Sequence, residues 1–219
     1  MSDFVPHHEA ESENPWLEIP LEDYESHMAA PSVEQTAMLA ETLGSLLRAH
    51  HPGSLALLGS AGGNGLEQVD PLVTKKVVIV DLNADYLTVC ARRFRHKFEH
   101  FESVLCDLST RPPLDEPVEF VYAGLVLEYL NQTFFLSYAP SLISSGGRIA
   151  FVFQNAASQG PVTDTGIASI RRLEAVHASV DVNEVVTTLS SNGMWVVDRR
   201  ALATVPGKQF TLLVLEKLS

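Results

Sequence analysis

A glycine-rich segment and the acidic residue that follows it carry the strongest chemical signal in this sequence. The segment 59–65, GSAGGNG, comes directly after a short apolar run, and Asp81 ends the next apolar run. Small residues permit a tight turn and let a ligand approach the backbone, whose free N–H groups bind an anion. Asp81 follows Gly59 by 81 − 59 = 22 residues, an offset typical of an acid that binds ribose hydroxyls. Each feature alone is also explained by a turn or a helix cap, but together they predict a nucleoside ligand.

The surrounding sequence predicts a doubly wound α/β sheet in which these two features meet. Short apolar runs alternate with helical patterns, which is typical of parallel strands joined by helices. The expected strands are 54–58, 77–80, 101–106, 118–123 and 148–153, with helices over 32–50, 84–98 and 131–141. Because parallel strands bind ligands at their carboxyl ends, the glycine loop and Asp81 are expected at the same edge of the sheet.

The two ends of the chain have different patterns. Helical patterns over 167–178 and 182–191 precede two strand-like runs, 194–205 and 209–217. The connection between these runs is too short for a parallel crossover, so the two strands must be antiparallel. Near the N-terminus, the segment 15–31 mixes aromatic and aliphatic residues with acids, and its prolines interrupt any long helix. We expect this segment to form an ordered arm on the domain.

The composition excludes several classes of function. The chain has 219 residues with 15 Lys+Arg and 27 Asp+Glu, so its net charge is 15 − 27 = −12. Nucleic acids held through phosphate contacts need clustered basic residues, so we expect no such partner. The sequence shows no secretion signal and no apolar run near the length of about 20 residues that spans a membrane, which predicts a cytoplasmic protein. Cys90 and Cys106 lack metal-ligand spacing, so we expect two reduced core thiols and no metal.

Five motifs, in order, resemble the class I S-adenosylmethionine (SAM)-dependent methyltransferases over residues 33–217. The motifs are LLGSAGGNG at 57–65, DLNADYL at 81–87, CDL at 106–108, YAGLVLEY at 122–129 and LISSGGRIAFVF at 142–153. The resemblance implies a Rossmann-like seven-stranded sheet with an antiparallel C-terminal strand. It also implies SAM as cofactor and S-adenosylhomocysteine (SAH) as its product. The stretch WLEIPLEDYESHMA at 16–29 resembles a bacterial subgroup of this family, which implies no particular substrate.

The resemblance implies ten cofactor-binding residues and shows two departures from the family pattern. It assigns Gly59, Ala61, Gly63 and Asn64 to the methionine end of the cofactor, Asp81 to the ribose, Leu82, Asp107 and Leu108 to the adenine, and Ala123 and Gly124 to the methyl end. Leu57 stands where the family commonly has an acid, and Ala61 stands where it has a glycine. The amino group of the cofactor would then be held by backbone carbonyls, by water or by the arm.

The expected reaction is the transfer of a methyl group from SAM to an oxygen or nitrogen of a small-molecule acceptor. A base is needed only when the acceptor must lose a proton, and no metal is required. The candidate bases are Tyr24, His27 and Glu128, although packing of the arm or the start of a helix also explains each of them. Gln154 and Asn155 are candidates for contact with a polar acceptor, and the segment 156–166 for a lid.

The sequence leaves two other functions open. One is a catalytically silent protein that binds SAM or SAH, and the other is an NAD-dependent dehydrogenase, whose fold usually continues into a parallel second half. In the preferred interpretation, residues 1–14 are a mobile acidic tail, 15–52 are an arm and helix that cover the cleft, and 53–219 are the SAM-binding methyltransferase domain. A monomer and a homodimer are equally compatible with the sequence.

Overall fold

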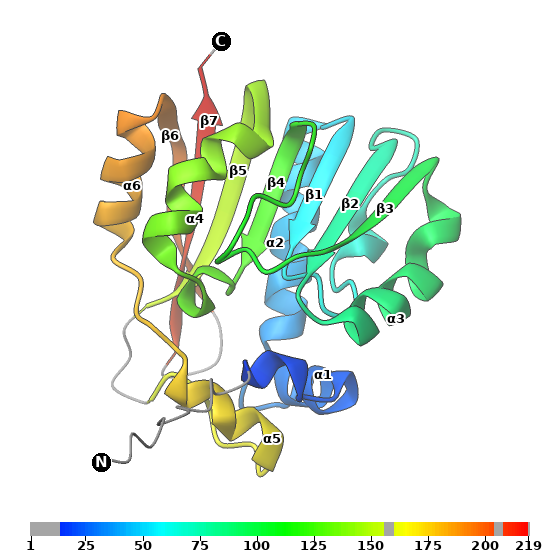
Figure 1. The fold of residues 1–219 in the computed structure, drawn as a ribbon, viewed down its shortest axis with the longest axis vertical. Coiled ribbons are helices and arrows are strands. Elements are labelled where there is room, and N and C mark those ends of the chain that lie inside the picture. Colours follow the sequence, from blue (N-terminus) through cyan, green and yellow to red (C-terminus); the bar gives the residue numbers. More distant parts are fainter. Residues whose placement is uncertain (1–13, 156–159, 204–207, 219) are drawn as a thin grey trace, which may run out of the picture.

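Seven strands form one mixed sheet at the centre of the computed structural model, which describes residues 14–155, 160–203 and 208–218 (Figure 1). The sheet order is β3-β2-β1-β4-β5-β7-β6. The strands are β1 (Ser54–Leu58), β2 (Lys76–Asp81), β3 (His100–Leu105), β4 (Val118–Gly124), β5 (Ile143–Gln154), β6 (Met194–Ala203) and β7 (Gln209–Lys217). Strands β1 to β5 pair in parallel, whereas β7 is antiparallel to both β5 and β6. The predicted doubly wound sheet with an antiparallel C-terminal strand is therefore confirmed.

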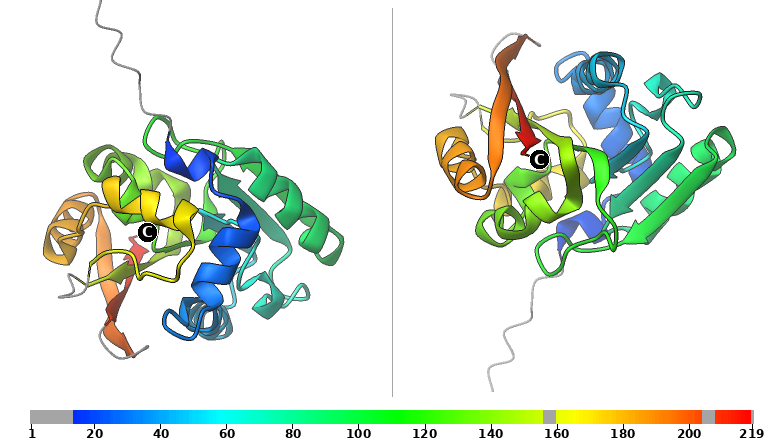
Figure 2. Two further views of the ribbon diagram at one scale, coloured as in Figure 1. Left: turned by 90° about the horizontal axis from the view of Figure 1, so that it is seen from below. Right: turned by 90° about the horizontal axis from the view of Figure 1, so that it is seen from above.

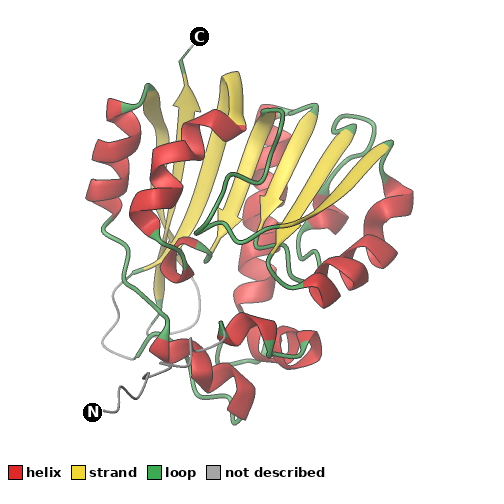
Figure 3. Ribbon diagram, in the orientation of Figure 1, coloured by secondary structure: helices red, strands yellow, loops and turns green. Residues whose placement is uncertain are grey.

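Helices cover both faces of this sheet (Figures 2 and 3). They are α1 (Leu21–Ala29), α2 (Gln35–His50), α3 (Ala84–Phe94), α4 (Gln132–Tyr138), α5 (Ala168–Arg171) and α6 (Val182–Ser191). Successive strand residues point to opposite faces. In β1, Leu55 and Leu57 therefore pack with α2 and α3, whereas Ala56 and Leu58 belong to the core cluster that contains α4 and α6. Strands β1, β2 and β4 are buried on both faces, whereas the edge strand β3 is largely exposed.

The arm contains more helix than the sequence predicts. Pro15–Leu17 forms a 3₁₀ turn, and α1 begins at Leu21 directly after Pro20, which occupies the N-cap position. As predicted, no long helix forms in this segment, and Pro20 precedes the short helix because proline is tolerated at a helix start. In Figure 1, α1 and α5 lie together below the sheet, at the edge where β1, β2 and β4 end, and the two helices contact each other.

Several element boundaries differ from the predicted ones. Helix α2 begins at Gln35, later than the start predicted at residue 32, and its N-cap is Glu34 in a left-handed conformation. The helix ends at His50, as the sequence predicts, and its C-cap is His51. The helix expected over 167–178 is the four-residue α5 followed by a 3₁₀ turn, Arg172–Ala175. Most of the predicted tail, the start of the predicted lid and the last two residues of the strand predicted over 194–205 lie outside the described residues.

Two further expectations concern the cysteines and membrane segments. Cys90 and Cys106 are both buried and free, as expected of reduced core thiols. Among the described residues, no helix combines the length and the apolar character that crossing a membrane requires.

Candidate functional site

The glycine loop turns sharply after β1 and is bonded to the neighbouring strand. Gly59, Ala61 and Gly63 all have positive φ angles, of +63°, +42° and +90°. The N–H of Ser60 donates to the carbonyl of Val80 at 3.0 Å, and the N–H of Gly63 donates to the carbonyl of Ser60 at 2.8 Å. Because glycine adopts positive φ without strain, Gly59 and Gly63 let this loop turn back along the end of β2.

Asp81, at the end of β2, joins the glycine loop to the start of α3. Its Oδ2 accepts a hydrogen bond from the Ala61 N–H, and its Oδ1 accepts one from the Asn83 N–H, both at 2.9 Å. Asp81 is only 8% exposed. Burial raises the pKa of this carboxyl, whereas the backbone N–H groups of Asn83, Ala61 and Leu82 lower it. The carboxylate is thus held in a fixed orientation, with lone pairs left for a ligand.

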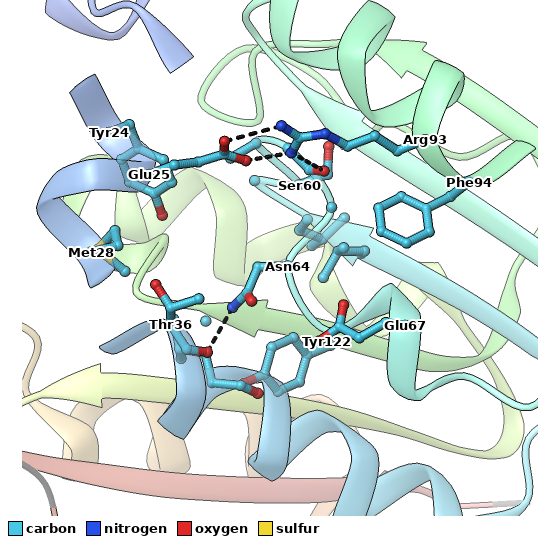
Figure 4. A pocket seen from close by; sticks show the side chains of 18 of the residues that line it. Tyr24, Glu25, Met28, Thr36, Ser60, Asn64, Glu67, Arg93, Phe94 and Tyr122 are labelled. Atoms are coloured by element: carbon cyan, nitrogen blue, oxygen red, sulfur yellow. Dashed lines mark hydrogen bonds and ion pairs between the residues drawn. The ribbon is translucent and has the colours of Figure 1, made fainter. Parts of the chain in front are cut away.

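Two adjoining cavities lie at this edge of the sheet. The first, which we call the loop cavity, has a volume of about 330 Å³ and lies among the glycine loop, the arm and α3 (Figure 4). The second, the Asp81 cavity, has a volume of about 70 Å³ and extends from Asp81 to Asp107. Tyr24, Gly59, Ala61 and Gly124 line both cavities. Of these two cavities, the loop cavity has a volume within the range of about 300–1,000 Å³ that is typical of ligand sites, and the Asp81 cavity is smaller.

Nine of the ten predicted cofactor residues line these two cavities. They are Gly59, Ala61, Gly63, Asn64, Asp81, Leu82, Asp107, Leu108 and Gly124. The exception is Ala123, which is 3% exposed and belongs to the core cluster beneath α4. Because successive residues of β4 alternate between faces, Ala123 points into the core there, and its neighbour Gly124 meets the cavities. Cofactor contact by the other nine stays a prediction.

The arm contributes residues that the sequence motifs do not identify. Trp16 lines the Asp81 cavity, and its ring meets those of Tyr24 and Tyr129 edge to face, with centroids 5.7 Å and 5.1 Å apart. The Asn83 side-chain amide donates to the Trp16 carbonyl at 2.9 Å, and the Tyr86 hydroxyl donates to the Ile19 carbonyl at 2.7 Å. These bonds join segments more than 60 residues apart, so no local pattern could have revealed them.

A third cavity brings the three candidate bases together. This Glu128 cavity has a volume of about 50 Å³, and Tyr24, His27 and Glu128 all line it. Tyr24 lines all three cavities and therefore stands where they meet. Gln154 lines the Glu128 cavity too, whereas the Asn155 side chain accepts a hydrogen bond from the Thr211 hydroxyl at 2.8 Å and lines none of the three.

The three candidate bases differ in their electrostatic environments. Burial raises the pKa of Glu128 from 4.5 to about 7. Hydrogen bonds from the backbone N–H groups of Gln154 and Glu128 lower this pKa, but by less than burial raises it. Burial, together with the positive charge of Lys208, lowers the pKa of His27 to about 4. Burial also raises the pKa of Tyr24 well above its usual value. Near neutral pH, Tyr24 is thus a neutral phenol and His27 a neutral imidazole, while Glu128 is close to its titration midpoint.

The Glu128 carboxyl is bound on one side only. Its Oε1 accepts a hydrogen bond from the Gln154 N–H at 2.7 Å, whereas Oε2 is buried without a hydrogen-bond partner among the described residues. A buried polar atom without a partner is uncommon in native structures and calls for an explanation. Here the atom belongs to a residue that lines a cavity, so a ligand or a water there can satisfy it.

Two neighbouring arginines form ion pairs on the surface. Arg171 pairs with Asp164, and Arg172 pairs with Glu18 of the arm. Both arginines are exposed and line none of the three cavities. No group of three or more potential metal-ligating side chains occurs in the part of the chain that the structure describes.

The tight packing of Gly63 leads to a stability prediction. A Cβ at this residue would lie 2.7 Å from both Cys90 Sγ and the Phe94 ring, at a φ of +90°. Gly146 also has a positive φ, of +73°, but a Cβ there would meet nothing within 4 Å. We therefore expect Gly63→Ala to lower the free energy of unfolding by about 2 kcal/mol more than Gly146→Ala, because only the first adds a collision to the backbone strain. Urea denaturation of both variants measures this difference, and equal losses would contradict the packing argument.

The comparisons with known proteins identify the fold. No family model and no curated protein matches the sequence. Among solved structures, N-methyltransferase NodS from Bradyrhizobium japonicum WM9 in complex with SAH is similar with a TM-score of 0.63 and 16% identity, over 91% of this chain and 98% of that one. Magnesium protoporphyrin IX methyltransferase (ChlM) from Synechocystis PCC 6803 with bound SAH has a TM-score of 0.66 and 12% identity, over 90% and 93%. The [4+2]-cyclase SpnF has a TM-score of 0.65 and 9% identity, over 86% and 83%. This chain has the fold of the class I SAM-dependent methyltransferases.

Proposed function

We propose that this protein transfers a methyl group from SAM to an oxygen or nitrogen atom of a small-molecule acceptor. The observation that carries the proposal is the continuous arrangement of the three cavities at the carboxyl edge of the sheet, with Tyr24 lining each of them. A methyl donor in the first two cavities would direct its reactive end toward the third. This arrangement suits a reaction in which two ligands must meet with water excluded.

The residues that line the loop cavity and the Asp81 cavity fit the parts of SAM. Asp81 presents a fixed carboxylate to which two neighbouring hydroxyls of a ribose can donate, and Leu82 and Leu108 offer apolar surface to a base beside Asp107. The small residues of the glycine loop leave room for the methionine end. When bound, SAM supplies an electrophilic methyl group, and the task of the protein is to position the acceptor against it.

Glu128 is the strongest candidate for the residue that takes a proton from the acceptor. A general base works best when its pKa lies near the working pH, and the pKa of about 7 meets this condition. The lowered pKa of His27 makes it a weak base, and the raised pKa of Tyr24 keeps it protonated. An acceptor with an N–H or O–H group could donate to the unpartnered Glu128 Oε2.

The size of the Glu128 cavity and the charge of the chain support a small acceptor. The cavity has a volume of about 50 Å³ and is lined partly by α1 and the segment after β5. A net charge of −12 disfavours nucleic acid held through phosphate contacts. Both observations favour a small acceptor that enters the space between the arm and the sheet.

A protein that binds SAM or SAH without methyl transfer is the second candidate. The similarity to the [4+2]-cyclase SpnF illustrates that this fold by itself does not specify methyl transfer. Leu57, which lines the loop cavity, provides no acid at the end of β1. Binding of SAH without turnover of any acceptor would favour this candidate.

Isothermal titration calorimetry with SAH, with NAD as control, tests the proposed function first. We expect SAH to bind with micromolar affinity and NAD not to bind. Incubation with methyl-labelled SAM and a panel of small amines, phenols and carboxylic acids then tests for label transfer to an acceptor. Failure of SAH to bind, or binding of NAD in its place, would contradict the proposal.

A further inference from the structure

An ion pair between the arm and α3 lines the loop cavity beside the glycine loop (Figure 4). Glu25 of α1 pairs with Arg93 of α3 through two hydrogen bonds, one of them from Nη2 to Oε2 at 3.1 Å. Arg93 Nη1 also donates to the Gly62 carbonyl at 3.1 Å. A side chain at Gly62 would collide with both charged groups. The pair therefore lies directly against the loop, in space that only a glycine leaves open.

The charged groups of this pair retain bonding capacity toward the cavity. An arginine has five N–H donors, and among the described residues Arg93 uses three, for the Glu25 carboxylate and the Gly62 carbonyl. The carboxylate of Glu25 has further lone pairs. The side chains of Arg93 and Glu25 are 41% and 40% exposed. One negative and one positive group are thus offered side by side to a ligand.

The hydroxyl of Ser60 is buried at the same cavity and has no hydrogen-bond partner among the described residues. Ser60 is only 3% exposed. Buried hydroxyls are normally paired, because an unpaired one loses its hydrogen bonds to water without replacement. A polar ligand group in the loop cavity would provide the missing partner.

We propose that Glu25 and Arg93 bind the amino-acid end of the cofactor, with the ammonium group against Glu25 and the carboxylate against Arg93. This inference rests on the proposed function. An amino acid carries both charges on neighbouring groups, so it complements an ion pair whose members lie side by side. Glu25 thereby supplies from the arm the acid that Leu57 does not provide at the end of β1. The Ser60 hydroxyl completes the site with one further hydrogen bond.

Contacts other than this ion pair also hold the arm in place. The arm is also bonded through Asn83 to the Trp16 carbonyl, through Tyr86 to the Ile19 carbonyl, and through the pairing of Glu18 with Arg172. Exposed ion pairs contribute little to stability. A role in ligand recognition explains why this pair, unlike that of Glu18 and Arg172, faces a cavity.

The test compares SAH with 5′-methylthioadenosine, which keeps the adenosine and the sulfur but lacks the amino-acid end. Calorimetry measures the affinity of both ligands for the wild-type protein, Glu25→Gln and Arg93→Gln. We expect each variant to bind SAH about tenfold more weakly, because a charge-assisted hydrogen bond is lost at a partly exposed site. Affinity for 5′-methylthioadenosine should change by no more than about twofold, since that ligand does not reach the pair.

Two further variants make the test specific. Arg172→Gln breaks the other ion pair of the arm, away from the cavities, and should leave the affinity for both ligands unchanged. Gly62→Ala keeps both charges but displaces the flexible ends of Glu25 and Arg93, at a residue where φ is not positive. It should weaken SAH binding while sparing 5′-methylthioadenosine.

Each outcome distinguishes the inference from the proposed function. Selective loss of SAH affinity supports the inference. Equal losses for both ligands would show that the pair only anchors the arm, and unchanged SAH affinity would show that it does not contact the ligand, so either result overturns the inference. If the wild-type protein binds neither ligand, the proposed function itself falls, and the inference falls with it.

Discussion

Replacing Asp81 with alanine is expected to weaken SAH binding by about 1.5–3 kcal/mol, or about 10- to 150-fold in Kd, the contribution of hydrogen bonds to a charged group. The carboxylate lines the Asp81 cavity and is oriented by the N–H groups of Ala61 and Asn83. Because its orientation is fixed before a ligand arrives, little entropy is lost when a ribose binds.

The same substitution has a second expected effect, on stability. The carboxylate satisfies two backbone N–H groups at a residue that is 8% exposed. Removing the carboxylate leaves both N–H donors without an acceptor, so we expect the free energy of unfolding to fall by about 2–4 kcal/mol. The fold should persist with reduced stability.

Calorimetry with SAH and urea denaturation measure these two effects separately. Asp85→Ala is the matched control, because Asp85 lies four residues further along the chain and is exposed on the first turn of α3, outside all three cavities. It should change SAH affinity very little. An unchanged binding isotherm for Asp81→Ala would refute the assignment of Asp81 to the ribose.

Glu128→Gln is expected to stabilise the protein at pH 8 and to have little effect at pH 5. Burial raises the pKa of Glu128 from 4.5 to about 7 in the folded state, so the folded protein binds more protons than the unfolded chain between these values. Stability is therefore lost as pH rises through this window. Complete ionisation costs about 3 kcal/mol. Glutamine keeps an oxygen for the Gln154 N–H but never acquires the charge.

Urea denaturation of the wild type and Glu128→Gln at pH 5 and pH 8 provides the measurement. Other groups that titrate over this range contribute equally to both proteins and cancel in the difference. Glu174→Gln supplies the matched control, because it removes an exposed carboxyl that lines none of the three cavities. A constant difference between the wild type and Glu128→Gln across pH would contradict the raised pKa.

The elements of the sheet could be read from the sequence because their signals are local. Apolar runs and their alternation with helical patterns depend on neighbouring residues, and the glycine loop and Asp81 follow directly from strand ends. The bounds of helices were less predictable. Helix α2 begins at Gln35, directly after Glu34 in a left-handed conformation that depends on packing. Glu34 makes no side-chain cap hydrogen bond, so no capping pattern in the sequence marks this start.

The side-chain environment of each candidate could not be read from the sequence. Glu128 looked like a helix start, and only the fold buries its carboxyl beside Gln154 with one oxygen unpartnered. Ala123 belonged to a methyl-end motif, yet its side chain lies in the core. Burial depends on which distant segments cover a residue, and a linear pattern does not specify that.

The sequence by itself determined the parallel sheet, its antiparallel C-terminal strand and the placement of the glycine loop and Asp81 at one edge. These follow from strand alternation and connection length, which are properties of short segments. Only the tertiary structure decided that Glu25 of the arm meets Arg93 of α3 against the loop, across 68 residues of sequence. Such a contact arises because the arm packs back onto the carboxyl edge of the sheet to bury its apolar side chains, and long-range packing of this kind produces no periodic pattern in the sequence.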